Sequence, residues 1–312
     1  MNKETKNNFN LTNLIKTIEK ESEEKSIILK DYKPKELKES NRKLSDLKRD
    51  NNGIIRLDDE PFLVLPKEET FNDNCFKVKL NNRLYLYLKG NRSKEENILE
   101  LLIMYFIKEL NMSCANYDII KFKNEEFLAS QSFLKGKEEI KHIIDEMPQI
   151  DEGYKVAKEY NNHIFFLKTC FIDRIIGNTD RFPCNYGIIT NRKINKRTAN
   201  YKNCPLFDNV GKEDIFIRDD KSLRFPYLTN RQDCACDKVI NHLLDYEEIM
   251  HWISNIVRKA NLEKAANRLF KEKRIYVDSE FYKKIEDFFK DSEAIINEEL
   301  KNKGKSFQIK LT

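Results

Sequence analysis

Three polar side chains, Asp180, Asn185 and Asp208, have types and spacing suited to phosphoryl transfer. The first two lie in the segment FIDRIIGNTDRFPCNYGIIT at 171–190, and the third lies in PLFDNVG at 205–211. A carboxylate at Asp180 can accept the proton of an attacking hydroxyl, or orient that hydroxyl. The oxygens of Asn185 and Asp208 are hard ligands of the kind that Mg²⁺ binds beside phosphate groups. Together they predict a site where a hydroxyl attacks a phosphate.

The spacing within this segment strengthens the prediction. Asp180 and Asn185 are separated by four residues, which equals the spacing of Asp and Asn in the protein-kinase catalytic loop. Asp208 then follows an apolar pair, as the metal-binding Asp of D-F-G does in that class. The alternative is that all three only close turns, since Asp and Asn often bond to nearby backbone.

The elements around the loop must hold it in place. Residues 156–176 predict one long helix with an apolar face, and Gly177 provides the residue at which such a helix ends. Short strands are expected at Tyr186–Thr190, directly after the loop, and at Pro205–Phe207, directly before Asp208.

The region before the loop predicts a small sheet with a single helix. The helix runs from about Ser93 to Glu109, and Ser93 with Glu96 matches a capping box. The expected strands are Phe62–Leu65, Cys75–Leu80, Leu84–Lys89, Tyr117–Phe122 and Glu126–Phe133.

Lys89 and Glu100 are the candidate pair for aligning phosphates. Lys89 ends an alternating strand, where an ammonium can reach phosphate oxygens, and Glu100 lies in the middle of the helix. Glu96 is the second choice as partner, with the helix cap as its other role. The alternatives are an exposed strand-end lysine and a glutamate on a solvated helix face.

The connection Ala129–Phe133 is expected to join two lobes, with Gln131 and Phe133 as candidate adenine-binding residues. An ordinary edge strand is the other interpretation. No glycine-rich phosphate motif occurs, and only the segment at 67–75 stands where such a loop belongs.

The fold class predicted from this order is α+β, a bilobal protein-kinase-like fold. A charged, partly helical extension covers 1–52, and a small β-rich N-lobe with one helix covers 53–135. A larger, mostly α-helical C-lobe covers 136–312, with the catalytic loop at 177–190. Its later helices are expected at 236–260, 261–271 and 279–302, the last capped by Ser279.

Composition narrows the possible functions. The chain of 312 residues carries 57 basic and 52 acidic side chains, a net charge of +5, so direct nucleic-acid binding is not expected. No run of 18 apolar residues and no apolar leader occur, so we expect no membrane span and a cytoplasmic location, with secretion by a route without a cleaved signal left open. The seven cysteines are expected to be ordinary reduced thiols.

The motif D-x-x-I-G-N-T-D-R-x-x-x-N-x-G, followed by [PL]-x-F-D-N-x-G, resembles the HipA-like serine/threonine kinases of bacteria, and within them the compact CtkA-like subgroup. The resemblance is strongest over 165–215 and weak over 75–260. It implies a protein-kinase-like fold, ATP with Mg²⁺, phosphorylation of serine or threonine hydroxyls in protein, and autophosphorylation. It also implies a possible antitoxin or regulatory partner.

Carried over by residue, the resemblance makes Asp180 the base and Asn185 and Asp208 the metal ligands, with Asp173 and Asn178 bracing the loop. The family pattern E-x10-[GN]-[IM] fits Glu100. The chain departs from the family at Phe182, where the common pattern has His.

Two alternative functions remain open at this point. The D-R-x-x-x-N loop also occurs in phosphoinositide kinases, which favours a lipid or small-molecule kinase. Phe182 and the scarcity of glycine favour a pseudokinase that acts as a binding module.

Overall fold

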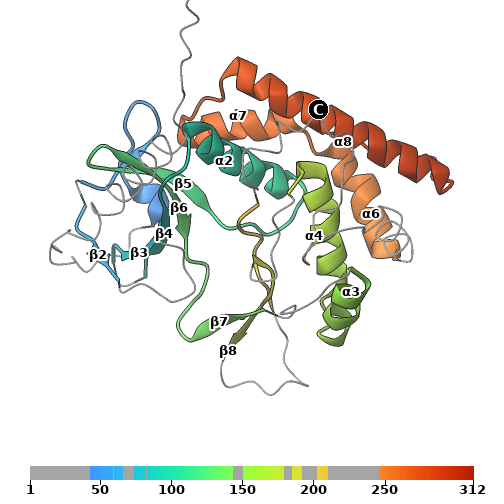
Figure 1. Ribbon diagram of the computed structural model, residues 1–312, viewed down its shortest axis with the longest axis horizontal. Helices are drawn as coiled ribbons and strands as arrows, with labels where there is room; N and C mark the ends of the chain where they lie inside the picture. Colours follow the sequence, from blue (N-terminus) through green and yellow to red (C-terminus); the bar gives the residue numbers. More distant parts are fainter. Residues whose placement is uncertain are drawn as a thin grey trace, which may run out of the picture. The chain divides into compact units, whose positions relative to one another are not determined.

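The computed structural model describes residues 43–58, 60–65, 74–81, 83–142, 150–178, 185–191, 202–209 and 246–312. These residues form two compact units. The sheet unit comprises Ile55–Arg92 and Ile119–Gln131 with the described residues up to Arg49, and the helical unit comprises Asp50–Ile54, Ser93–Asp118 and the described residues from Ser132 on. The presence of both sheets and helices confirms the predicted α+β class (Figure 1).

The sheet unit is built on six strands in the order β1-β5-β6-β4-β3-β2. Its elements are the 3-10 helix η1 (Leu44–Asp46), β1 (Ile55–Arg56), β2 (Leu63–Val64), β3 (Cys75–Lys79), β4 (Tyr85–Lys89), β5 (Tyr117–Phe122) and β6 (Glu125–Gln131). β1 is parallel to β5, and β2, β3, β4 and β6 pair antiparallel in turn. The predicted strands therefore exist, each within two residues of its expected ends.

Alternation along β4 explains how this sheet forms a core. Leu86 and Leu88 are fully buried, while Tyr85, Tyr87 and Lys89 are only partly covered. This period of two is the mark of a strand with one face on the core. The buried side chains join one apolar cluster, in which the rings of Phe62 and Phe122 meet edge to face, with centroids 5.2 Å apart.

The helical unit contains most of the remaining elements. Its helices are α2 (Lys94–Glu109), α3 (Ile150–Glu159), α4 (His163–Ile176), α6 (Glu247–Asn255), η4 (Val257–Lys259), α7 (Leu262–Lys273) and α8 (Ser279–Asn302). A three-stranded sheet has the order β7 (Glu138–Lys141), β8 (Ile188–Asn191), β9 (Lys202–Asn203). In Figure 1, α7 runs along α2. Within the described part of the chain, no helix combines the length and apolar character needed to cross a bilayer.

The capping box predicted for α2 is confirmed. The Ser93 side chain accepts the N–H of Glu96 at 3.0 Å, and the Glu96 carboxylate accepts the N–H of Ser93 at 2.7 Å. Glu96 is thus used by the cap. Burial extends around the whole helix rather than along one face, because every residue from Asn97 to Ile107 is buried.

The single long helix expected at 156–176 is wrong. The chain breaks between α3 and α4 at Asn161, whose φ of 52° is left-handed, and Asn162 then precedes the first turn of α4. Asparagine tolerates this conformation better than other non-glycine residues. The end of α4 agrees with the prediction, since Gly177 is its left-handed C-cap, with φ 64°.

Three smaller predictions are also corrected. Strand β7 was not expected in the region after 136, and β9 at Lys202–Asn203 replaces the strand predicted at Pro205–Phe207, where Leu206 makes only an isolated bridge. The N-cap of α8 is Asp278 rather than Ser279, because its carboxylate accepts two backbone N–H groups.

Candidate functional site

Glu100 and Asn209 meet in the interior of the helical unit. The Oε1 atom of Glu100 accepts the backbone N–H of Asn209 at 3.0 Å and its side-chain Nδ2 at 3.4 Å. Each residue is 1% exposed, so the predicted alternative of a solvated glutamate is wrong. This contact joins the middle of α2 to the residue that directly follows Asp208.

The segment before Asp208 is fixed by its backbone. Leu206 donates its N–H to the carbonyl of Ser113 at 2.9 Å and accepts the N–H of Ala115 at 2.8 Å. The N–H of Asp208 is donated to the Tyr117 hydroxyl at 2.8 Å. Asp208 itself has a left-handed φ of 50°, which turns the chain at this residue. The backbone at Asp208, a partly exposed residue, is therefore fixed by bonds to the buried residues Tyr117 and Glu100.

The start of the predicted catalytic loop lies beside the same segment. After α4 ends at Gly177, the amide of Asn178 donates to the Asp173 carboxylate and to the backbone carbonyl of Asp208, both at 3.3 Å. Asp173 and Asn178 are 1% and 0% exposed. They join the end of α4 to the backbone of Asp208, while the bracing of the loop itself stays a prediction. Asp180, the predicted base, and Phe182 follow at 179–184, outside the described residues.

The electrostatic environment of this cluster is negative. Burial raises the pKa of Tyr117 well above its usual value, and the nearby charges of Glu100 and Asp208 raise it further. Tyr117 therefore stays a neutral hydroxyl at ordinary pH. Two carboxylates close to one buried hydroxyl suit a neighbouring cation.

Asn185 is positioned by its neighbour in the chain. Tyr186 is buried between the rings of Phe165 and Phe166, with centroids at 6.0 Å and 5.7 Å, and its hydroxyl donates to Asn162 at the start of α4. Burial raises the pKa of Tyr186 well above its usual value, so this donor is kept. The far end of the predicted loop is therefore anchored on α4, the same helix that carries Asp173.

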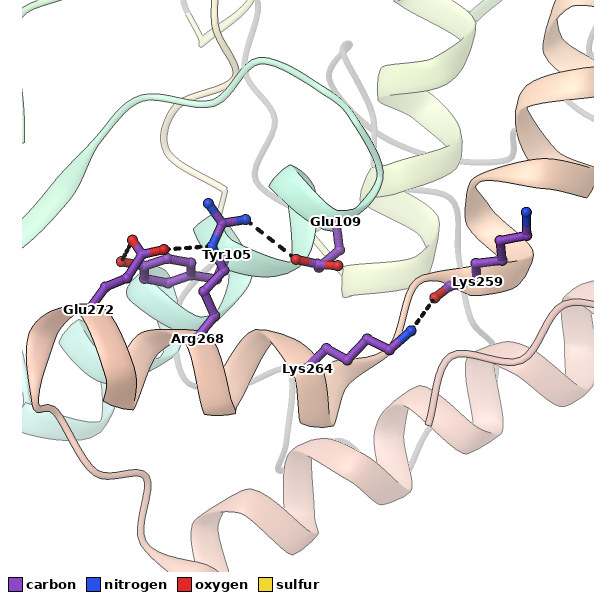
Figure 2. A network of polar contacts seen from close by, with 6 residues as sticks. All are labelled: Tyr105, Glu109, Lys259, Lys264, Arg268 and Glu272. Carbon is purple, nitrogen blue, oxygen red and sulfur yellow. Dashed lines mark hydrogen bonds and ion pairs between the residues drawn. The ribbon is translucent and has the colours of Figure 1, made fainter.

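Helix α2 is attached to the rest of the helical unit by polar contacts (Figure 2). The Tyr105 hydroxyl donates to Glu272 at 2.8 Å, and Arg268 bonds Glu272 at 2.7 Å and Glu109 at 3.4 Å. At the C-terminal end of α2, the Trp252 indole donates to the carbonyl of Leu110 at 2.8 Å. The helix that carries Glu100 is thus linked to both α7 and α6.

The remaining predicted site residues lie on other elements. Lys89 ends β4 in the sheet unit, and Gln131 ends β6, where the chain passes from the sheet unit to the helical unit. Phe133 lies beyond the strand, and its ring is 5.9 Å from that of Phe207, the residue before Asp208. Among the described residues, no group of three or more His, Cys, Asp and Glu is suited to hold a metal.

Sequence reasoning missed Asn209 and Tyr117. Asn209 stands in the quoted motif, so its position next to Asp208 was the available signal. Tyr117 was assigned only to a strand, and nothing in its sequence context indicates a bond to a residue 91 positions away.

No protein-family model matches the chain, and no curated protein matches it in sequence. Solved structures similar to it include the Helicobacter pylori proinflammatory kinase CtkA, at 13% identity over 77% of this chain and 94% of that chain, with a TM-score of 0.45. Another is HipA of Shewanella oneidensis MR-1, solved with HipB and operator DNA, at 14% identity over 92% of this chain and 73% of that chain, with a TM-score of 0.48. Both belong to the group that the motif resembles. Both similarities are distant.

Proposed function

We propose that this protein is an ATP- and Mg²⁺-dependent protein serine/threonine kinase of the HipA type that also phosphorylates itself. The contact between Glu100 and Asn209 carries the proposal. It joins a helix carboxylate to the segment of Asp208 over 109 residues of sequence, and Asn178 adds the start of the catalytic loop. Two residues selected from the sequence for one reaction, Glu100 and Asp208, thus stand on segments that are bonded to each other, which supports the proposal.

The donor atoms around Asp208 fit a magnesium–nucleotide complex. Mg²⁺ is usually held by one or two carboxylates together with substrate phosphates and waters, so a site of this kind needs no large cluster of protein ligands. The bound metal would neutralise charge on the phosphates. In the proposal Asp208 and Asn185 hold the metal, and Glu100 orients the Asp208 segment through Asn209.

The other predicted residues complete the proposed mechanism. Asp180 accepts the proton of the attacking hydroxyl, and Lys89 contacts the phosphates. Gln131 and Phe133 bind the adenine. Most of the rate gain comes from positioning and from charge stabilisation, because phosphoryl transfer needs little covalent chemistry from the protein.

A partner is part of the proposal. The HipA structure from Shewanella oneidensis MR-1 contains HipB and operator DNA, and this assembly is a property of that protein. For this chain we propose an antitoxin-like or regulatory protein partner. The expectation that the chain itself does not bind nucleic acid stays a prediction, as does its cytoplasmic location.

The test is incorporation of labelled phosphate from ATP with Mg²⁺ into the purified protein and into added protein substrates. We expect incorporation by the wild type, and a loss of at least about 100-fold in Asp180→Ala and in Asp208→Ala. Lys284→Ala, a substitution on the exposed side of α8, is the control and should keep full activity.

Other outcomes identify the alternatives. Turnover of ATP only after addition of a lipid or metabolite would favour the small-molecule kinase. Absence of any thermal stabilisation by Mg²⁺–ATP would contradict both enzyme functions. The binding module would then be the remaining function.

A further inference from the structure

Asn97 is a buried polar side chain with no visible use in the fold. It lies in α2, is 1% exposed, and neither its Nδ2 nor its Oδ1 has a hydrogen-bond partner in the described structure. Burying an unpaired amide is unfavourable, and native proteins rarely do so without a reason. The side chain can be satisfied by a molecule that is not part of the protein.

The other buried asparagines show that this is an exception. Asn81 accepts two backbone N–H groups, at 2.9 Å each. Asn162, Asn178 and Asn209 each donate to at least one oxygen. Four of the five asparagines that are buried in the described chain are therefore bonded through their side chains, and Asn97 alone is not.

The position of Asn97 connects it with the candidate site. It precedes Glu100 by three residues in a regular helix, so both side chains lie on one face, with Cβ atoms about 5–6 Å apart. Side chains on a helix also tilt toward its N-terminus. The unpaired amide thus lies one helical turn from Glu100, whose carboxylate holds the backbone beside Asp208.

We propose that Asn97 is a binding residue for the metal–phosphate part of the nucleotide, an inference that rests on the proposed kinase function. An unpaired amide offers a donor and an acceptor together. A hydrated Mg²⁺–phosphate group presents the matching pair: phosphate oxygens that accept the Nδ2 hydrogens, and metal-bound water that donates to Oδ1. An apolar group supplies neither, and the edge of adenine, which also carries a donor and an acceptor, is distinguished by measuring adenosine binding separately.

The experiment compares two properties of Asn97→Leu: thermal stability without ligand, and affinity for the non-hydrolysable analogue AMP-PNP with Mg²⁺. Replacing an unpaired buried amide by an apolar group of similar size removes a desolvation cost. We therefore expect a melting temperature equal to or above that of the wild type, together with about tenfold weaker binding of Mg²⁺–AMP-PNP. Binding of adenosine should not change. Asn97→Ala, which removes the amide without adding bulk, should show the same loss of affinity.

Asn81→Leu is the matched control, because it is the same substitution at a buried asparagine whose side chain is bonded. It should lower the melting temperature and leave the affinity for Mg²⁺–AMP-PNP unchanged. If the wild type binds Mg²⁺–AMP-PNP and both Asn97 variants bind it equally well, the role of Asn97 is refuted and the kinase proposal stands. If the wild type itself does not bind this analogue, the kinase proposal fails and the inference fails with it.

Discussion

The Glu100–Asn209 contact places a carboxylate where water cannot reach it, so its partner must be a donor. Asn209 supplies a backbone N–H and a side-chain amide, and that amide also lies 3.4 Å from the Cys114 sulfur. A buried charge is tolerated only when hydrogen bonds replace its hydration. The identity of residue 209 is therefore restricted by Glu100.

Asn209→Asp tests this restriction. It places a second carboxylate against Glu100 in a buried site, and we expect a loss of about 3 kcal/mol in the free energy of unfolding, measured in urea. Adding Glu100→Gln should recover part of the loss, because the new amide can donate to the new carboxylate. The control is Asn116→Asp, the same change at an exposed position 2.8 Å from the Lys108 ammonium, which should change stability little. Equal losses at both positions would contradict the argument.

At this scale the sequence indicates candidates for chemical function more readily than the residues that hold them. Glu100 and Asp208 were selected because their types and order match a known reaction, and both lie in the cluster. Tyr117 was not selected, since its role is to accept one backbone N–H from a distant segment. Such a bond depends on tertiary packing, and no local sequence pattern predicts it.

Among the elements, α2 is held on α7 by the Tyr105, Glu272, Arg268 and Glu109 side chains (Figure 2). Burial alone would raise the pKa of Glu272, but hydrogen bonds from Arg268 and Tyr105 outweigh it and lower the pKa below its ordinary value near 4.5. A carboxylate whose pKa is lower in the folded state binds protons more weakly there than in the unfolded chain. Its ion pair therefore stabilises the fold above pH 4.5, and this contribution disappears as the pH falls through the lowered pKa.

Glu272→Gln should reveal that pH dependence. At pH 7 we expect a loss of roughly 0.5–1 kcal/mol in the free energy of unfolding, since the pair is partly exposed. The difference from the wild type should shrink below pH 4.5. Glu280→Gln, on an exposed pair in α8, should differ from the wild type by only a few tenths of a kcal/mol. A difference for Glu272→Gln that stays constant down to pH 3 would rule out the ion pair as the cause.

The elements themselves were predicted where a local signal exists and missed where the signal is tertiary. The capping box of α2 and the left-handed Gly177 are encoded in a few adjacent residues, and both are found. The break between α3 and α4 was missed because the apolar pattern continues across it. It depends on Asn162, which is buried against Tyr186 and Asn203, two residues from other elements.

At the scale of the whole molecule, strand β5 takes part in both units. Ile120 pairs with Ile55 and is fully buried in the core of the sheet unit. Three residues earlier in the same strand, the backbone N–H of Tyr117 is donated to the Met104 sulfur, and the Tyr117 hydroxyl accepts the backbone N–H of Asp208. Met104 and Asp208 both belong to the helical unit. Because one short strand contributes to two cores, unfolding of either unit should remove support from the other.

The single tryptophan makes this coupling measurable, since Trp252 lies in the helical unit, where it packs edge to face on Phe171. We expect its fluorescence and the far-UV circular dichroism to report one coincident urea transition. Ile120→Ala, a cavity in the sheet unit, should cost about 2–5 kcal/mol and shift the Trp252 transition by the full amount. The control is Ile249→Ala, at an equally buried position in α6. It should shift the Trp252 transition whether or not the two units unfold together. A Trp252 midpoint that does not move in Ile120→Ala, while the dichroism shows an earlier phase, would mean that the two units unfold independently, and that β5 does not transmit stability between them.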